Sequence, residues 1–328
     1  MHITQFPRSI LAVILLLAVA VGCSSRPAAD SPNPSAAGSG SATAAASAEP
    51  RVVRHLKGET TIEGEPSKIA VLDYRLADSM LALGAKPYAM TTYLGSTDTE
   101  YLEGKPLEGV KNLGDKTNLE AVLDAAPDLI IARKGDEAIY DQLNKIAPTI
   151  LLEETGDWRK DLRSFADILG KSEQASQWLQ QYEGKATEAK NKLAAASAAG
   201  KTVAILRVLE KEYRVYGTSP QLGGIVYGDL GLQAPDSVKA IKKFQAISME
   251  SLPEFDADFL FVQVGFPAVG GDKEAEKKFD ELKQSSLWRN LKAVKNDQAF
   301  VLPYWTLRDF PLINEKALEL VTRKMTGK

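Results

Sequence analysis

The folded part of this 328-residue chain is predicted to be an α/β protein in which two Rossmann-like α/β lobes are joined by a single long interlobe α-helix. Three observations predict this fold class. Short apolar segments alternate with segments of helical periodicity in two regions of the chain, which is typical of α/β lobes with parallel sheets. A stretch of helix-forming composition separates the two regions. A helix–strand pattern also recurs, once in each region.

The first lobe is predicted to span residues 51–170. Asn118 and Asp157 are suited to cap the starts of helices, and Gly84 and Gly170 are suited to end them. The apolar runs are short enough for buried strands. Strands are expected at 68–73, 87–92, 128–132 and 149–152, and helices at 75–83, 118–125, 137–145 and 157–169.

Residues 171–200 are predicted to form the helix between the lobes. The stretch 172–199 lacks proline, has a single glycine and is rich in alanine, glutamine, glutamate and lysine, which favour helices. Such a helix would extend about 40 Å at 1.5 Å per residue and end at Gly200. An intermittent apolar stripe marks its buried side, formed by Leu179, Tyr182, Ala186 and Leu193.

The second lobe is predicted to span residues 201–328. It shows the same alternation of apolar strands and helices, and Trp288 is expected near a turn. Strands are expected at 202–207, 213–216, 258–263 and 299–302, and helices at 222–230, 274–282 and 312–325.

An internal repeat relates the two lobes. Residues 118–131 align without gaps with residues 248–261, and in each copy a capping residue is followed two positions later by a glutamate, Glu120 or Glu250. A short apolar helix and a strand led by aspartate are expected to follow in both. The simplest account is two similar lobes. A chance likeness between two common helix–strand units is the alternative.

The N-terminal segment, residues 1–22, is predicted to be a secretory signal. Arg8 supplies a positive charge, and residues 10–21 form an apolar run of about a dozen residues, shorter than the roughly 20 that a membrane-spanning helix needs. The sequence Ala20-Val21-Gly22-Cys23 resembles a bacterial lipobox, with alanine where leucine is usual. We therefore expect Cys23 to be lipidated. An ordinary signal peptide followed by an unmodified cysteine is the alternative.

The segment 23–50 is predicted to be a flexible tether. It consists almost entirely of serine, alanine, glycine and proline, and cannot bury enough apolar surface to offset the entropy of ordering it. A lipid, a tether and a globular part together predict a protein held on the extracytoplasmic face of the cell membrane. A Gram-positive cell surface suits this arrangement, and anchoring in a periplasm is the alternative.

Composition excludes several kinds of chemistry. Cys23 is the sole cysteine, so once it carries lipid the chain has no disulfide, no thiolate metal ligand and no cysteine nucleophile. The two histidines, His2 and His55, cannot build a His-rich metal site, so we expect no protein-held metal and no cofactor. We assign no catalytic residues, although a hydrolase based on two carboxylates stays open. A net charge of −3 argues against nucleic acid as a partner.

Several motifs resemble one family of transport proteins. They are the segments 118–120 with 127–131, 157–159 with 165–170, 227–231 and 247–250. These segments and the two-lobe organisation resemble the substrate-binding lipoproteins of ABC importers for ferric siderophores, haem and vitamin B12, over residues 51–328. The resemblance implies a monomeric binding protein that is not an enzyme and that delivers its ligand to ABC permease subunits. It also implies that Glu120 and Glu250 dock onto the permease, one from each lobe.

Candidate ligand contacts lie at strand ends, because α/β sheets bind ligands beyond the carboxyl ends of their strands. Arginine supplies bidentate donors for carboxylate and hydroxamate oxygens, and aromatic side chains supply surface for a carbon skeleton. Each of these residues could instead be an ordinary surface or core residue. The candidates are Tyr74, Arg75, Tyr93, Arg133, Arg207, Tyr213, Arg214, Gln263, Trp305 and Arg308.

The expected ligand is a ferric siderophore, with iron entering only as part of the chelate. The mixture of cationic and aromatic candidates favours a hydroxamate or citrate-hydroxamate siderophore over a trianionic tris-catecholate, which would require more cations. Haem or cobalamin on the same fold is the alternative ligand. An exported hydrolase and a surface adhesion protein are alternatives from other functional classes.

Overall fold

The computed structural model describes residues 50–96, 100–104, 106–196, 198, 200–218, 221–266 and 271–327. The predicted signal segment, Cys23 and the tether up to residue 49 lie outside the described residues. In the described part of the chain, no helix is both long and apolar enough to cross a bilayer.

The first lobe is built on a five-stranded parallel sheet with the strand order β5-β4-β3-β6-β7. Its four predicted strands are present: β3 and β4 are shorter than expected, β6 is shifted by one residue, and β7 has the expected bounds. Strand β5 was not predicted. An antiparallel hairpin, also not predicted, precedes this sheet, and the Leu56 amide after its first strand donates to the Leu151 carbonyl of β7 over 3.1 Å. The strands are β1 (Arg51–His55), β2 (Gly58–Ile62), β3 (Ile69–Val71), β4 (Ala89–Met90), β5 (Lys111–Asn112), β6 (Leu129–Arg133) and β7 (Thr149–Leu152).

Two helices of the first lobe, α2 and α4, begin at the predicted caps. The Asn118 side chain accepts hydrogen bonds from the Glu120 and Ala121 amides, and Asp157 caps the next long helix in the same way. The helix expected at 137–145 is divided into a 3₁₀ segment and a single α-turn. The helices are α1 (Tyr74–Ala82), α2 (Leu119–Ala125), η1 (Lys134–Ile139), α3 (Tyr140–Leu143) and α4 (Trp158–Leu169).

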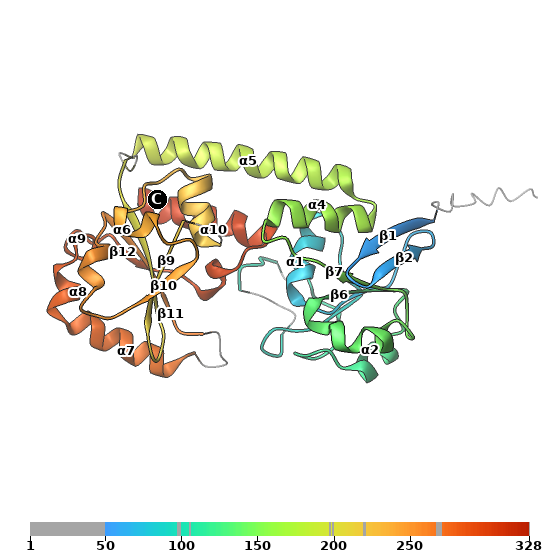
Figure 1. Cartoon of the computed structure of the whole chain (residues 1–328). Helices are drawn as coiled ribbons and strands as arrows, with labels where there is room; N and C mark the ends of the chain where they lie inside the picture. The colour runs from blue at the N-terminus through green and yellow to red at the C-terminus, as the bar shows by residue number, and fades with distance from the viewer. Residues whose placement is uncertain are drawn as a thin grey trace, which may run out of the picture. The chain divides into compact units, whose positions relative to one another are not determined.

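The interlobe helix α5 (Ser172–Ala195) has 24 residues and is therefore about 36 Å long. It packs against α4 and α10, as Figure 1 shows. The helix ends four residues earlier than predicted. The Ala198 amide donates to the Leu193 carbonyl over 3.0 Å, a wider turn that stops the α-helical pattern before Gly200.

The second lobe has a mixed five-stranded sheet with the order β10-β9-β8-β11-β12, in which β9 and β10 are antiparallel to their neighbours. Strand β10 was not predicted. The strands are β8 (Val203–Val208), β9 (Tyr213–Tyr216), β10 (Phe244–Ile247), β11 (Phe259–Val264) and β12 (Ala299–Val301).

Two helical predictions in the second lobe were wrong in detail. The segment expected to be α-helical at 222–230 is mostly the π-helix η2, and Trp288 lies within a short α-helix instead of near a turn. The helical elements are η2 (Gly224–Asp229), α6 (Asp236–Lys239), η3 (Leu252–Phe255), α7 (Lys273–Gln284), α8 (Ser286–Asn290), α9 (Lys292–Lys295), η4 (Tyr304–Leu307) and α10 (Pro311–Thr326).

The sequence repeat corresponds to a structural repeat. Asp128 precedes β6 and accepts hydrogen bonds from the Ser67 and Lys68 amides at the start of the neighbouring strand, at 2.8 and 2.9 Å. Asp258 precedes β11 and accepts from the Thr202 amide in the same relation, at 2.9 Å. The short helix differs between the copies, because α2 is α-helical and its counterpart η3 is a 3₁₀ helix.

A single apolar core runs through both lobes. Alternate residues of β6 and of β8 enter this core, because successive side chains of a strand point to opposite faces. The same core includes the buried faces of α1, α4, α5 and α10. Two further clusters cover the outer face of each sheet, under α2 and α3 in the first lobe and under α7 and α8 in the second. The lobes therefore share hydrophobic packing in addition to the covalent link through α5.

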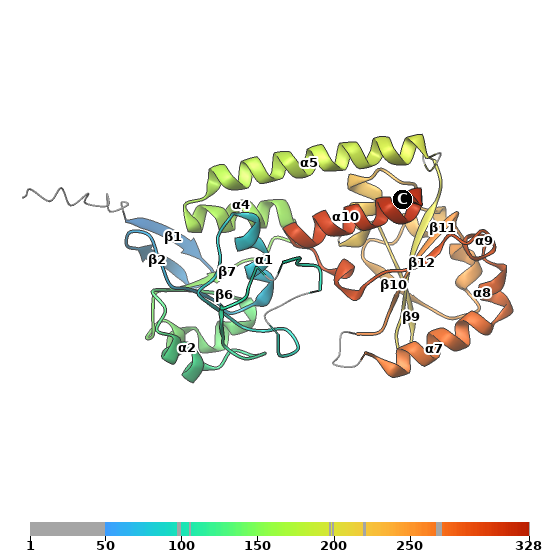
Figure 2. The same ribbon diagram turned by 180° about the vertical axis from the view of Figure 1, so that it is seen from behind.

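The start of α10 is capped by a side chain from the other lobe. Phe310, at its N-cap, gives no side-chain hydrogen bond. The α1 residue Asp78 instead accepts from the Leu312 amide at 2.9 Å and the Ile313 amide at 3.2 Å. Asp78 is fully buried, and burial raises the pKa of its carboxyl group to about 7, against the opposing effect of these hydrogen bonds. Figure 2 shows α10 lying next to α5 and reaching the first lobe near α1.

Replacement of this cap should destabilise the whole folded part. We expect Asp78→Ala to lower the free energy of unfolding at pH 5 by about 2 to 4 kcal/mol, because two buried amides lose their acceptor. Urea unfolding measures the effect, with Asp124→Ala as an exposed control. Because the folded-state pKa of Asp78 lies above the ordinary aspartate value of 3.8, native protein binds the extra proton between about pH 4 and 7. The difference between wild type and variant should therefore shrink as the pH rises through that window, and a difference that grows with pH would contradict this account.

Candidate ligand-binding site

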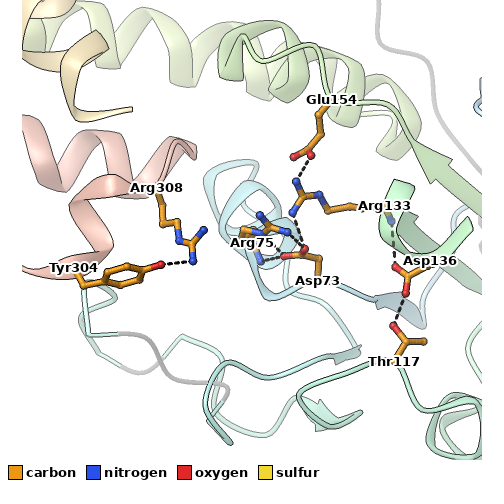
Figure 3. Close-up of polar contacts among 8 residues, drawn as sticks. All are labelled: Asp73, Arg75, Thr117, Arg133, Asp136, Glu154, Tyr304 and Arg308. Carbon is orange, nitrogen blue, oxygen red and sulfur yellow. Dashed lines mark hydrogen bonds and ion pairs between the residues drawn. The ribbon is translucent and has the colours of Figure 1, made fainter. Parts of the chain in front are cut away.

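Two arginines of the first lobe converge on one carboxylate at the end of β3. Asp73 caps α1 by accepting from the Arg75 amide at 2.9 Å, and its Oδ1 also accepts from Arg75 Nε at 2.7 Å. Its Oδ2 accepts from Arg133 Nη1 at 2.7 Å, and Arg133 also pairs with Glu154 (Figure 3). Both first-lobe arginines are thus neutralised by carboxylates of their own lobe.

A cavity of about 360 Å³ lies at these strand ends. Its charged lining is balanced, with as many basic as acidic side chains. Burial raises the pKa of Glu154, with Arg75 acting in the opposite direction, and burial also raises the pKa of Asp136, which accepts from the Thr117 hydroxyl at 2.6 Å. The charged residues are Arg75, Lys116, Arg133 and Lys134 on the basic side and Asp73, Asp115, Asp136 and Glu154 on the acidic side.

Arg207 is held differently in the second lobe. It lies next to the last residue of β8 and is only 6% exposed. Its Nη2 and Nε donate to the Gly265 carbonyl at 2.8 and 3.2 Å, and its Nη1 donates to the Tyr216 hydroxyl at 3.3 Å. Its guanidinium carbon lies 4.3 Å from the ring centre of Phe266 and 5.5 Å from that of Tyr304. Aromatic and carbonyl groups therefore orient this cation without cancelling its charge.

Arg308 shares the Tyr304 ring with Arg207. Its guanidinium carbon lies 5.2 Å from the centre of that ring, and its Nη2 donates to the Tyr304 hydroxyl. Within the described ranges, the ion pairs of the structure include neither Arg207 nor Arg308. The second lobe therefore presents two cations with uncompensated charge around one aromatic ring.

Aromatic residues bring the two lobes together next to this ring. Tyr74 and Tyr93 of the first lobe are 4.6 Å apart between ring centres. Burial raises the pKa of Tyr93, the neighbouring Tyr304 and Tyr74 add to the rise, and the positive charge of Arg308 opposes it. Tyr74, Tyr93, Tyr304 and Arg308 therefore form one cluster, to which each lobe contributes, and we call it the interlobe cluster.

Three other candidates have structural partners. Gln263 is fully buried and donates to the Thr306 hydroxyl at 2.5 Å, which holds η4 against β11. Trp305 packs against Tyr101, with ring centres 5.7 Å apart. Arg214 pairs with Glu212. These contacts make Gln263 a support for the segment that carries Tyr304 and Arg308.

Tyr213 lies apart from the other candidates. It belongs to the cluster on the outer face of its sheet, 4.5 Å from Lys278 measured to the ring centre. Its neighbour on the strand, Arg214, points to the opposite face, where its guanidinium carbon lies 4.4 Å from the centre of the Phe244 ring. The structure thus gathers Tyr74, Tyr93 and Arg308 and does not bring Tyr213 to them.

Sequence reasoning missed the carboxylates of the site. Asp73 is the last residue of one predicted strand and Glu154 follows another closely, and this position was the available signal. Phe266, whose ring lies over the Arg207 guanidinium, was also not singled out as a contact. Among the residues that the structure describes, no group of three or more His, Cys, Asp or Glu side chains is placed to hold a metal ion.

The two glutamates of the repeat are both exposed. Glu120 lies in the first turn of α2, and Glu250 lies two residues before η3. Glu120 therefore occupies the position that the repeat predicts, two residues after the cap, whereas Glu250 precedes Ser251, the N-cap of η3. Both side chains are accessible to a partner.

Residues 69–304, more than half of the chain, match the periplasmic binding protein family. The chain belongs to this family. The probable siderophore-binding lipoprotein YfiY of Bacillus subtilis (strain 168) is 37% identical over 266 residues, which are 77% of this chain and 80% of that protein. The iron(3+)-hydroxamate-binding protein YxeB of the same organism is 32% identical over 283 residues, covering 84% of each chain.

A solved structure supports the same assignment for the fold. A FhuD fold-family protein from Bacillus subtilis, described as the periplasmic binding protein component of a Fep/Fec-like ferrichrome ABC transporter, superimposes with a TM-score of 0.74 at 30% identity. The match covers 84% of this periplasmic binding protein and 99% of that chain. The predicted fold class and the predicted resemblance to siderophore-binding lipoproteins are confirmed. Family membership also confirms a binding component of a transporter in place of an enzyme.

Proposed function

We propose that this periplasmic binding protein captures a ferric siderophore of the hydroxamate or citrate-hydroxamate type and delivers it to an ABC permease. The observation that carries the proposal is the pair of uncompensated cations, Arg207 and Arg308, around Tyr304. Hydroxamate and carboxylate oxygens around ferric iron accept hydrogen bonds from guanidinium groups, and the tyrosine rings offer surface to the carbon skeleton. The names of the two relatives, one siderophore-binding and one iron(3+)-hydroxamate-binding, support this ligand class.

The proposal includes an anchored, monomeric protein. Cys23 would carry lipid and the tether 23–50 would follow from it, so that the binding domain searches solvent close to the permease. The relative YfiY is named a lipoprotein, which supports this placement at the extracytoplasmic face of the cell membrane.

Arg207 should strengthen ligand binding without stabilising the folded protein. We expect Arg207→Met to weaken binding of a ferric trihydroxamate about ten- to a hundred-fold, because charge-assisted hydrogen bonds contribute about 1.5 to 3 kcal/mol each. Removal of a buried cation that has no carboxylate partner should leave the free energy of unfolding unchanged or higher. Quenching of tryptophan fluorescence measures the dissociation constant, and Arg323→Met serves as an exposed control. An unchanged dissociation constant would remove Arg207 from the site.

Ligand binding should change the angle between the lobes only slightly. The lobes share one apolar core, a continuous helix joins them, and Asp78 fixes α10. A large closure requires residues that absorb a backbone change, and these contacts oppose it. Small-angle X-ray scattering with and without the ferric chelate tests this expectation. A marked decrease in the radius of gyration on binding would show that the lobes close, and therefore that α5 bends or the shared core rearranges.

Glu120 and Glu250 should act in delivery and not in capture. Two exposed carboxylates, one per lobe, can set orientation and register on a two-fold permease, and exposed ion pairs contribute more to specificity than to affinity. We expect the double variant Glu120→Ala/Glu250→Ala to keep ligand affinity and thermal stability while uptake of radioactive iron by cells is lost. The matched control is Asp124→Ala/Glu254→Ala, which removes the same charge from exposed positions of α2 and η3, one in each lobe.

Two outcomes would count against the docking role. Normal uptake by a well-expressed double variant would refute it. An equal loss of uptake in the control would show that general negative charge matters and that these two positions do not. A modest fall in melting temperature with normal uptake would indicate that the glutamates serve only the positive ends of their helices.

A further inference from the structure

The two lobes place opposite charges at equivalent positions. In the first lobe Ile69 of β3 pairs with Leu129 of β6, and in the second Val203 of β8 pairs with Phe259 of β11. The aspartate that precedes β6 accepts a hydrogen bond from the residue before Ile69, and the aspartate that precedes β11 accepts one from the residue before Val203. Ile69 and Val203 are therefore equivalent positions in the two lobes. Four residues after Ile69 the chain carries Asp73, and four residues after Val203 it carries Arg207.

The partner strands reinforce the difference. Arg133 is the fourth residue after Leu129, and Gln263 is the fourth after Phe259. The first lobe therefore has an aspartate bonded to an arginine over 2.7 Å, a neutral pair. The second lobe has an arginine whose register partner is the uncharged Gln263, a pair with one positive charge.

The surroundings preserve this polarity. Glu154 provides Arg133 with a second carboxylate, and Asp73 also holds Arg75, so the first-lobe cavity has no surplus positive charge. On the second-lobe side, Arg308 adds its charge to that of Arg207 without an ion pair in the described part of the chain. Among the described residues of the site, the positive charge that no carboxylate balances therefore lies on the second-lobe side.

We infer that the site selects ligands by charge, and that Asp73 is the residue that determines this specificity. The preferred ligand is a ferric chelate of low net charge, whose anionic edge lies against Arg207 and Arg308 and whose neutral or cationic edge lies against Asp73. A ferric tris-catecholate, with three negative charges, would meet the Asp73 and Glu154 carboxylates directly. This inference rests on the proposed function and specifies the ligand class of the same site.

The expected discrimination is large enough to measure. Asp73 is paired with Arg133 in the native site, so its own repulsion of an anion is largely balanced there. Removal of its charge leaves one arginine uncompensated, and at an effective dielectric constant of about 20 two charges about 8 Å apart interact strongly enough to change binding about thirty-fold. Each negative charge that a ligand brings near this position should respond to Asp73→Asn by an amount of this order, and a neutral trihydroxamate should not.

Asp73→Asn isolates the charge from the structural role of this residue. Asparagine caps helices as well as aspartate does, so α1 should keep its N-cap. Glu154→Gln provides a second variant that leaves the cap untouched. Asp124→Asn, on the exposed face of α2, makes the same change in net charge outside the cavity and serves as the control.

The experiment compares three probes on the full-length protein: a ferric tris-catecholate, a neutral ferric trihydroxamate and a ferric trihydroxamate with a free ammonium group. We expect wild type to bind both trihydroxamates at least about a hundred-fold more tightly than the tris-catecholate. Asp73→Asn should strengthen tris-catecholate binding about ten- to a hundred-fold, change the neutral probe less than about three-fold and weaken the cationic probe. Glu154→Gln should act in the same direction.

Two results would overturn the inference. Equal affinity of wild type for the tris-catecholate and the neutral trihydroxamate would show that the site does not discriminate between ligands by their net charge. An unchanged affinity ratio in folded Asp73→Asn and Glu154→Gln, or the same shift in Asp124→Asn, would remove Asp73 from this role while leaving siderophore capture in place. Failure of wild type to bind any ferric chelate would instead refute the proposed function, and the inference with it.

Discussion

The buried carboxylate of Asp78 is the contact on which the arrangement of the two lobes depends. It belongs to α1 of the first lobe and satisfies the first free amides of α10, a helix of the second lobe that otherwise starts without a side-chain cap. Helix α10 then packs along α5, which packs on α4. The chain thus closes a circuit from one lobe to the other and back. Separation of the lobes at any one of these contacts would leave the buried start of α10 without its cap, which is costly.

The consequence for the site is that its geometry is preset. Tyr304 and Arg308 lie on the segment that leads directly into α10, and Gln263 holds the same segment from β11 through Thr306. Tyr74 follows β3 at the start of α1, the helix that also bears Asp78. The interlobe cluster is therefore supported from both sides by elements that cannot shift independently. Such support lowers the conformational cost of binding, as expected for a protein that must capture a dilute ligand.

Much of this architecture could be predicted from the sequence, because the information is local. The caps Asn118 and Asp157, the alternation of strands and helices and the aspartates that begin two equivalent strands are all visible within a few residues. Other features depend on distant partners. Strand β10 is set by its pairing with β9, a contact that no local pattern reveals.

The charge pattern of the site illustrates the same limit. The sequence places Arg75 and Arg133 at strand ends but does not tell that Asp73 binds both, since Arg133 is 60 residues away along the chain. One error was avoidable. Tyr213 and Arg214 are adjacent on one strand, so their side chains had to point to opposite faces, and both could not belong to one site.

The balanced lining of the first-lobe cavity also has a kinetic consequence. Paired charges a few ångströms apart produce a field that decays much faster than that of a single charge, and physiological salt screens the remainder beyond about 8 Å. With a net charge of −3 on the whole chain, an anionic molecule in solution experiences little long-range attraction. Encounter would then be governed by ordinary diffusion and local abundance, and its rate would be nearly independent of ionic strength. Such a receptor would work equally well in dilute and in saline surroundings.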